Sequence, residues 1–129
     1  MNPVELRYHR TNTTAFIAVK PSVITLTPRD RVRQPSGGFK YVDKAVRAAQ
    51  VFRIIELGAN QTPPIIQLTD GTQREAEFWL LGQWDALVDI DDYWTAVDPG
   101  TGNERTWIVG DIVRPNGYET RALVVERGQ

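Results

Sequence analysis

The side chains that most often carry out acid–base or nucleophilic chemistry are sparse in this chain. It contains one histidine, His9, and no cysteine. A catalytic triad needs an imidazole that is held by an orienting partner, and His9 lies in a polar, weakly patterned N-terminal stretch. Without cysteine there is neither a disulfide framework nor a thiolate metal site. We therefore expect no catalytic residue and no enzyme activity.

Carboxylates are concentrated in one short stretch of the second half. Its members are Asp85, Asp89, Asp91 and Asp92. Clustered carboxylates can run acid–base chemistry or bind a hard cation. However, the order of acids and glycines does not match the calcium-binding loop of an EF-hand. We therefore favour a solvated acidic loop, or an acidic patch that faces a basic neighbour, over a metal site, and we expect no cofactor.

Glycines are grouped at two places that could be mistaken for phosphate-binding loops. Gly37-Gly38 and the Gly100-Thr101-Gly102 tripeptide both lack the Lys-Ser/Thr ending of such loops. They also lack the strand before and the helix after that those loops require. We interpret both groups as turns.

Basic residues are concentrated between residues 29 and 53. This stretch contains seven basic residues against two acids, whereas residues 54–129 contain five arginines against thirteen acids. The seven are Arg29, Arg31, Arg33, Lys40, Lys44, Arg47 and Arg53. Aromatic residues are interleaved with them, as in surfaces that contact phosphate. The same pattern suits ion pairing with a partner protein or with a copy of the chain, and scattered solvated charge remains the third interpretation.

Four tryptophans offer a second candidate surface, because bases can stack on exposed indole rings. They are Trp79, Trp84, Trp94 and Trp107. The alternative is that they pack in the core or in an interface, and we assign Trp107 to the core. Trp79 lies on the face of its strand opposite Phe78 and Leu80, so both faces carry large apolar side chains that must be shielded from water. Another subunit is one candidate for shielding one of these faces.

The elements that must position these residues are short strands. Alternation predicts strands at residues 16–19, 23–33, 51–57, 65–68, 75–81, 93–97, 107–112 and 118–125. Pro28 interrupts the second of these, because proline cannot donate a ladder hydrogen bond. Asp70-Gly71 and Asn116-Gly117 are typical of tight hairpin turns. Residues 43–50 fit either a short helix or an extended arm, and residues 84–88 have helical spacing over one turn.

This pattern predicts a mostly β fold, an antiparallel barrel or compact sandwich with at most one short helix. The length of 129 residues fits one domain. We expect an N-terminal arm at residues 1–13 and a single β domain at 14–129. Phe78, Leu80, Trp107, Val109, Leu123 and Val125 are the predicted core residues. No apolar run is long enough for a signal core or a membrane span, so we expect synthesis in the cytoplasm.

Several segments, taken in order, resemble the neck proteins of long-tailed bacteriophages. They are the run from Ser22 to Arg29, the loop Pro35-Ser-Gly-Gly38 and Ala49-Gln-Val-Phe-Arg53. The second half adds Phe78-Trp-Leu-Leu-Gly82, Asp85, Asp92-Tyr-Trp94 and the ending Pro115-Asn-Gly-Tyr-Glu-Thr-Arg-Ala122. This order is similar to head-closure proteins, also called head-to-tail stoppers or connectors, especially those of phages with actinobacterial hosts. The similarity spans about residues 14–127.

The resemblance implies a structural virion protein that assembles as a homo-oligomeric ring below the portal and its adaptor. Such rings close the DNA-filled head and dock the tail. The implied partners are the portal-adaptor protein on the head side and a tail-terminator or tail-completion protein on the tail side, with the packaged DNA as a further candidate and no membrane. The resemblance also implies a small antiparallel β-barrel with a long loop or hairpin extension, for which residues 29–53 are by position the candidate. This basic stretch is the candidate for inter-subunit or channel contacts, and the four aspartates are its candidate acidic partners. The alternatives are a tail-terminator or tail-completion subunit and a nucleic-acid-binding β-barrel.

Overall fold

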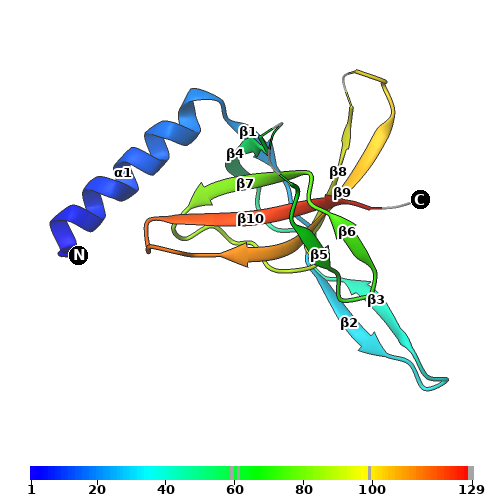
Figure 1. Ribbon diagram of the computed structural model, residues 1–129. Helices are drawn as coiled ribbons and strands as arrows, with labels where there is room; N and C mark the ends of the chain where they lie inside the picture. The colour runs from blue at the N-terminus through cyan, green and yellow to red at the C-terminus, as the bar shows by residue number, and fades with distance from the viewer. Residues whose placement is uncertain (59, 61, 99, 128–129) are drawn as a thin grey trace.

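The fold is mostly β, with one helix at the N-terminal end (Figure 1). The computed structural model describes residues 1–58, 60, 62–98 and 100–127. Its elements are α1 (Pro3–Val19), β1 (Ser22–Ile24), β2 (Arg29–Arg33), β3 (Phe39–Asp43), β4 (Gln50–Glu56), β5 (Ile65–Gln67), β6 (Gln73–Glu75), β7 (Phe78–Gln83), β8 (Tyr93–Val97), β9 (Glu104–Val113) and β10 (Glu119–Glu126). Among the described residues, no helix is both long and apolar enough to cross a membrane.

Six strands form one nearly closed, barrel-like antiparallel sheet in the order β1-β4-β7-β10-β9-β8. The two edge strands of this sheet come together at one end only. There Thr27 bridges Tyr93 through two backbone hydrogen bonds of 2.9 and 3.1 Å. This confirms the predicted fold class, with Pro28 marking the break between β1 and β2 as expected.

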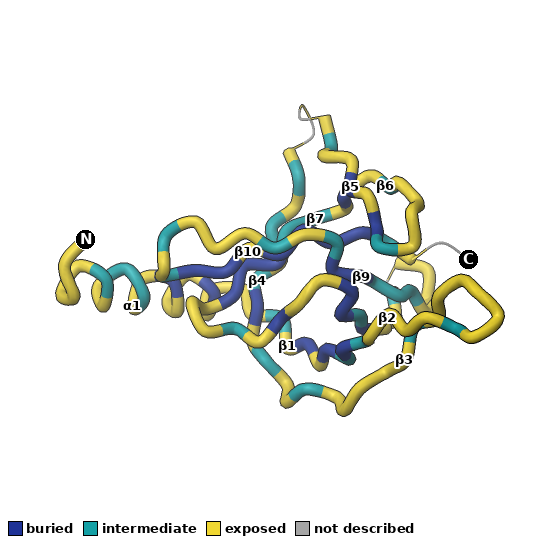
Figure 2. The backbone as a smooth tube through the Cα atoms, turned by 90° about the horizontal axis from the view of Figure 1, so that it is seen from below, coloured by how far each residue is buried: buried dark blue, intermediate teal, exposed yellow. Residues whose placement is uncertain are grey.

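Two hairpins extend from the sheet. The β5–β6 hairpin turns at Asp70-Gly71, as predicted. The β2–β3 hairpin pairs Arg29 with Asp43 at its base and Arg33 with Phe39 near its tip. Its tip turns at Gly37-Gly38, where both glycines have positive φ. Figures 1 and 2 show this hairpin reaching away from the body as an exposed finger.

The core consists of two apolar clusters. One comprises Ile24, Leu26, Phe52, Leu80, Val88, Trp94, Val109, Ala122 and Val124. The other comprises Ile66, Leu68, Ala76, Ile108, Leu123 and Val125, and Trp79 packs against it. Residues of the β5–β6 hairpin and its turn therefore help to cover the face that bears Trp79, within the same chain. Of the predicted core, Phe78 and Trp107 are only half-buried.

The N-terminal region differs from the prediction. Residues 3–19 form a helix, so the strand predicted at residues 16–19 was wrong, and most of the expected arm is helical. The helix begins with a well-formed cap, in which the side chain of Asn2 accepts from the amide of Glu5 and Pro3 follows at the first helical position. Only Thr13 and Ile17 are buried. This weak apolar pattern explains why periodicity did not reveal the helix.

The two ambiguous segments are both non-helical. Residues 44–49 run alongside the body, where the amides of Lys44 and Arg47 donate to the carbonyls of Pro28 and Leu26 at 2.8 and 3.0 Å. Trp84 and Asp85 form a turn, so the helical spacing of residues 84–88 was misleading. The projecting part of the predicted extension is thus Arg29–Asp43, since β4 belongs to the main sheet.

Candidate assembly interface

The β2–β3 hairpin is anchored at its base by Arg29. Its side chain is only 7% exposed, and its guanidinium carbon lies 4.1 Å from the ring centre of Tyr41 and 5.4 Å from that of Tyr93. Nε donates to the backbone carbonyl of Asp91 at 2.9 Å, and Nη2 lies 3.9 Å from the Asp91 carboxylate. Since Tyr41 belongs to the hairpin and Tyr93 to the sheet, Arg29 joins the two.

Hydroxyl groups extend this anchor. The Thr69 hydroxyl lies 2.8 Å from both carboxylate oxygens of Asp91 and also meets the Tyr41 hydroxyl. Because a threonine hydroxyl has one proton, donation to Asp91 leaves Tyr41 as the donor to Thr69. Asp91 itself adopts φ of 77°, a conformation that is uncommon for a residue with a side chain. The base of the hairpin is therefore a connected polar network rather than an apolar contact.

Tyr93 makes a further link to the hairpin. Its hydroxyl donates to the Asp43 carboxylate at 2.6 Å. This hydrogen bond to Asp43, with a smaller contribution from burial, raises the pKa of Tyr93 above its ordinary value. Protonated Tyr93 is therefore the form that fixes the end of β3.

Arg47 fixes the segment that follows the hairpin. It donates from Nε to Asp92 and from Nη2 to Asp89, each at 2.9 Å. The hydrogen bond to Asp92 is the main cause of the raised pKa of Arg47. Asp92 is almost fully buried, with 1% of its side chain exposed. Lys44 pairs with Asp30 at 3.0 Å on the surface.

The predicted basic and acidic residues thus meet, but within one chain. Asp91 and Asp92 are satisfied by Arg29 and Arg47, so their carboxylates are not available to a neighbouring subunit. Asp89 is exposed and shares Arg47. Asp85 is exposed in the turn after β7. Among the described residues, no group of three or more histidine, aspartate or glutamate side chains is arranged to hold a metal ion.

The tip of the hairpin differs from its base. Arg31, Arg33 and Lys40 are exposed, and none of them is in an ion pair with a described residue. The guanidinium of Arg31 lies 3.8 Å from the ring centre of Phe39. Two apolar side chains of the tip are also exposed, Val32 by 40% and Phe39 by 54%, and Val42 near the base is exposed by 43%. A two-stranded finger has no further layer to cover them, so the tip combines uncompensated positive charge with open apolar surface.

Arg53 and His9 belong to a different site, the contact between α1 and the sheet. Arg53 donates to the carbonyl of Phe16 at 2.9 Å, and its guanidinium lies 3.9 Å from the Phe16 ring centre. His9 stacks on Tyr118 with ring centres 4.7 Å apart. Both residues therefore help to keep α1 packed against the sheet.

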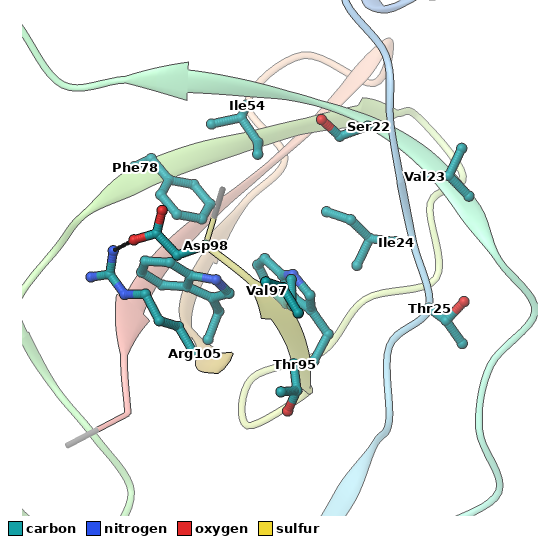
Figure 3. Close-up of a pocket in the computed structure, with 13 residues that line it drawn as sticks. Ser22, Val23, Ile24, Thr25, Ile54, Phe78, Thr95, Val97, Asp98 and Arg105 are labelled. Atoms are coloured by element: carbon teal, nitrogen blue, oxygen red, sulfur yellow. Dashed lines mark hydrogen bonds and ion pairs between the residues drawn. The ribbon is translucent and has the colours of Figure 1, made fainter. Parts of the chain in front are cut away.

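A cavity that the sequence did not reveal lies between the two edge strands of the main sheet, with a volume of about 530 Å³. Figure 3 shows residues of β1, including Ser22 and Ile24, across an opening from Thr95 and Val97 of β8. These residues are distant in sequence, and only closure of the sheet brings them together.

Comparison with known proteins found no matching family model, no matching curated protein and no matching solved structure.

Proposed function

We propose that this chain is a structural subunit of the neck of a long-tailed bacteriophage, a head-to-tail connector that forms a ring, closes the DNA-filled head and docks the tail. The observation that carries the proposal is the β2–β3 hairpin, which is clamped at its base and open at its tip. The segments that resemble head-closure proteins support it independently, as does the small barrel-like sheet that bears the hairpin.

A clamped finger suits assembly for a physical reason. In a ring, each subunit meets its neighbour through two different surfaces. A flexible loop would lose conformational entropy when it docks, whereas a hairpin ordered beforehand has a smaller cost. The polar network around Arg29 orders this one before any partner is bound. The exposed charge at the tip then gives the direction of docking and favours rapid association.

On this proposal, the hairpins point to neighbouring subunits or to the channel, while other surfaces meet the portal-adaptor protein and the tail-completion protein. The direct test mixes the purified protein with tailless, DNA-filled heads and images the products. We expect a ring at the portal vertex and retention of the DNA. Heads that bind no protein would overturn the proposal.

A charge-reversal variant tests the part played by the hairpin. Arg31→Glu combined with Arg33→Glu should leave the free energy of unfolding nearly unchanged, because both side chains are exposed. It should nonetheless reduce ring formation on the heads. The matched control combines Arg7→Glu with Arg114→Glu, which makes the same change of charge at two exposed positions outside the finger. Equal loss in both variants would show that net charge, and not the hairpin, matters.

Nucleic-acid binding by the free protein is the second candidate, because Arg31 and Phe39 combine a cation with an exposed ring at the tip. Phosphate contact and base stacking use these two groups. This alternative predicts that the isolated chain binds single-stranded DNA, with an affinity that falls steeply as salt increases. A connector whose hairpin contacts protein shows no such binding as a monomer.

A further inference from the structure

The cavity between β1 and β8 is an open seam in the sheet. The Thr27–Tyr93 bridge joins the edges at one end, and beyond it no described strand pairs with the outer edge of either strand. The seam therefore has two strand edges as walls. Its floor is apolar and comes from Ile54, Phe78, Trp94 and Trp107.

The outer edge of β8 offers backbone groups for another strand. The amide and carbonyl of Tyr93 face Thr27 across the seam. Because successive residues of a strand direct their backbone groups to opposite sides, those of Thr95 and Val97 face the same way as those of Tyr93, while Trp94 and Ala96 pair with β9. Thr95 and Val97 are exposed. An exposed edge of this kind is a template for addition of a strand.

The rim of the seam is acidic. Asp98 lines the cavity, and Glu56 and Glu126 lie on the same face of the sheet, since their register partners are Phe78 and Trp107. Arg105 is paired with Asp98 and Glu126, and Arg74 is a second positive charge near Glu126. The three carboxylates still outnumber these two cations, and Glu56 is in no ion pair with a described residue. The preferred occupant is therefore a basic, extended segment with apolar side chains.

We propose that the seam receives the tip of the β2–β3 hairpin from a second copy of this chain, so that a hairpin strand extends the β8 edge and closes the neighbour's sheet. This rests on the proposed ring and names the surface that accepts the finger. The tip meets each requirement, with unpaired cations in Arg31, Arg33 and Lys40, exposed apolar side chains and a free strand edge.

The geometry favours a second copy over the chain's own finger. Figure 1 shows the β2–β3 and β8–β9 hairpins leaving the body in different directions. The Arg29 network holds the base of the finger in that orientation. Donor and acceptor are thus separate surfaces of one chain, which is the condition for head-to-tail association into a ring.

Photo-crosslinking tests which surface the finger reaches. Phe39 is replaced by p-benzoylphenylalanine, which keeps an aromatic ring at the tip, and the protein is irradiated both in concentrated solution and bound to heads. We expect covalent dimers, with the attachment mapped by mass spectrometry to residues 22–25 or 94–98 of the other copy. Attachment elsewhere, or no dimer under either condition, overturns the proposal.

A proline variant tests the role of the strand edge. Thr95→Pro removes an amide that faces the seam and leaves the pairing with β9 intact, as edge strands allow. Thr95→Ala is the matched control, because it too loses the hydroxyl contact with Thr106 but keeps the amide. If the two variants have similar thermal midpoints, Thr95→Pro should self-associate about tenfold more weakly than Thr95→Ala. This is the effect of losing about one hydrogen bond. Equal association of the two variants overturns strand addition.

The results separate this inference from the proposed function. If wild-type protein forms rings on heads but the crosslinks map outside the seam, the connector function stands and the docking site is wrong. If copies crosslink through the seam but never bind heads, the docking site stands and the connector function is wrong.

Discussion

At the scale of single residues, the Arg29 side chain decides where the finger points. It is nearly buried and lies between two tyrosine rings, one from the finger and one from the sheet. Removal of one partner from a buried charged pair leaves the other uncompensated. Arg29→Met should therefore lower the free energy of unfolding by about 3 kcal/mol, measured by urea denaturation.

The matched control is Arg31→Met, which makes the same substitution on the same strand. Arg31 is exposed and has no acidic partner among the described residues, so its loss should change the stability by less than about 0.5 kcal/mol. Equal effects of the two substitutions would contradict the distinction between base and tip.

Tyr93 makes the anchor sensitive to alkaline pH. Its pKa is raised by the hydrogen bond to Asp43, so the bond stabilises the protein fully below the pKa of an unfolded tyrosine, about 10. That stabilisation is lost as the pH rises through the higher pKa of the folded state. Tyr93→Phe should cost about 0.5–1 kcal/mol at pH 8.

The difference between wild type and Tyr93→Phe should shrink toward zero as the pH is raised above the pKa of the folded tyrosine. Urea denaturation of both proteins from pH 8 upward measures it. A difference that persists at the highest pH would show that the hydroxyl acts through packing and not through its proton.

At the scale of elements, helix α1 is held on the sheet more by hydrogen bonds and ring contacts than by buried apolar surface. Only Thr13 and Ile17 are buried, and Arg53 provides both a hydrogen bond and a ring contact to Phe16. Arg53→Met should weaken this docking by about 1 kcal/mol. Amide exchange in residues 3–19 should then become about fivefold faster, with β7 and β10 unchanged.

Arg7→Met is the control for this experiment, because Arg7 lies on the exposed side of the same helix. It should leave the exchange rates of α1 unaltered. Faster exchange throughout the sheet in Arg53→Met would instead mean that helix and sheet unfold together.

At the scale of the whole molecule, incomplete closure of the sheet divides the aromatic residues into two groups. Phe52 is 1% exposed and packs closely against Gly82, where an added Cβ would lie 2.9 Å from the Phe52 ring. Phe78 is half-buried and lines the open seam. Phe52→Ala should therefore cost about 3–5 kcal/mol, and Phe78→Ala less than half as much.

Thermal or urea denaturation of the two variants checks this order. Because alternation places Phe78 in the core, the sequence alone predicts that Phe78→Ala lowers the free energy of unfolding as much as truncation of a fully buried ring. If Phe78→Ala proves as costly as Phe52→Ala, the seam is closed in the free protein, and the docking site proposed for the second copy is absent.

Most strand breaks and turns follow from the sequence by itself, although the strand expected at residues 16–19 is part of the helix. Alternation, Pro28 and the pairs Asp70-Gly71 and Asn116-Gly117 act through neighbouring residues, so they predict strand breaks and hairpins without any knowledge of tertiary contacts. The concentration of basic residues was equally visible, but it extended to residue 53, whereas the finger ends at residue 43. The helix was not predicted, because only Thr13 and Ile17 of it are buried and its apolar pattern is weak; the cap formed by Asn2 and Pro3 was the local signal that could have indicated it.

Only the tertiary structure decided which charges are free. Seven basic residues look alike in the sequence, yet Arg29, Arg47 and Arg53 hold the chain's own parts together, while Arg31, Arg33 and Lys40 remain open. The open seam was hidden for the same reason. The ion pair of Arg47 with Asp92 joins residues 45 positions apart, and the gap between β1 and β8 lies between residues some 70 positions apart. Local pattern carries no information about contacts over such separations.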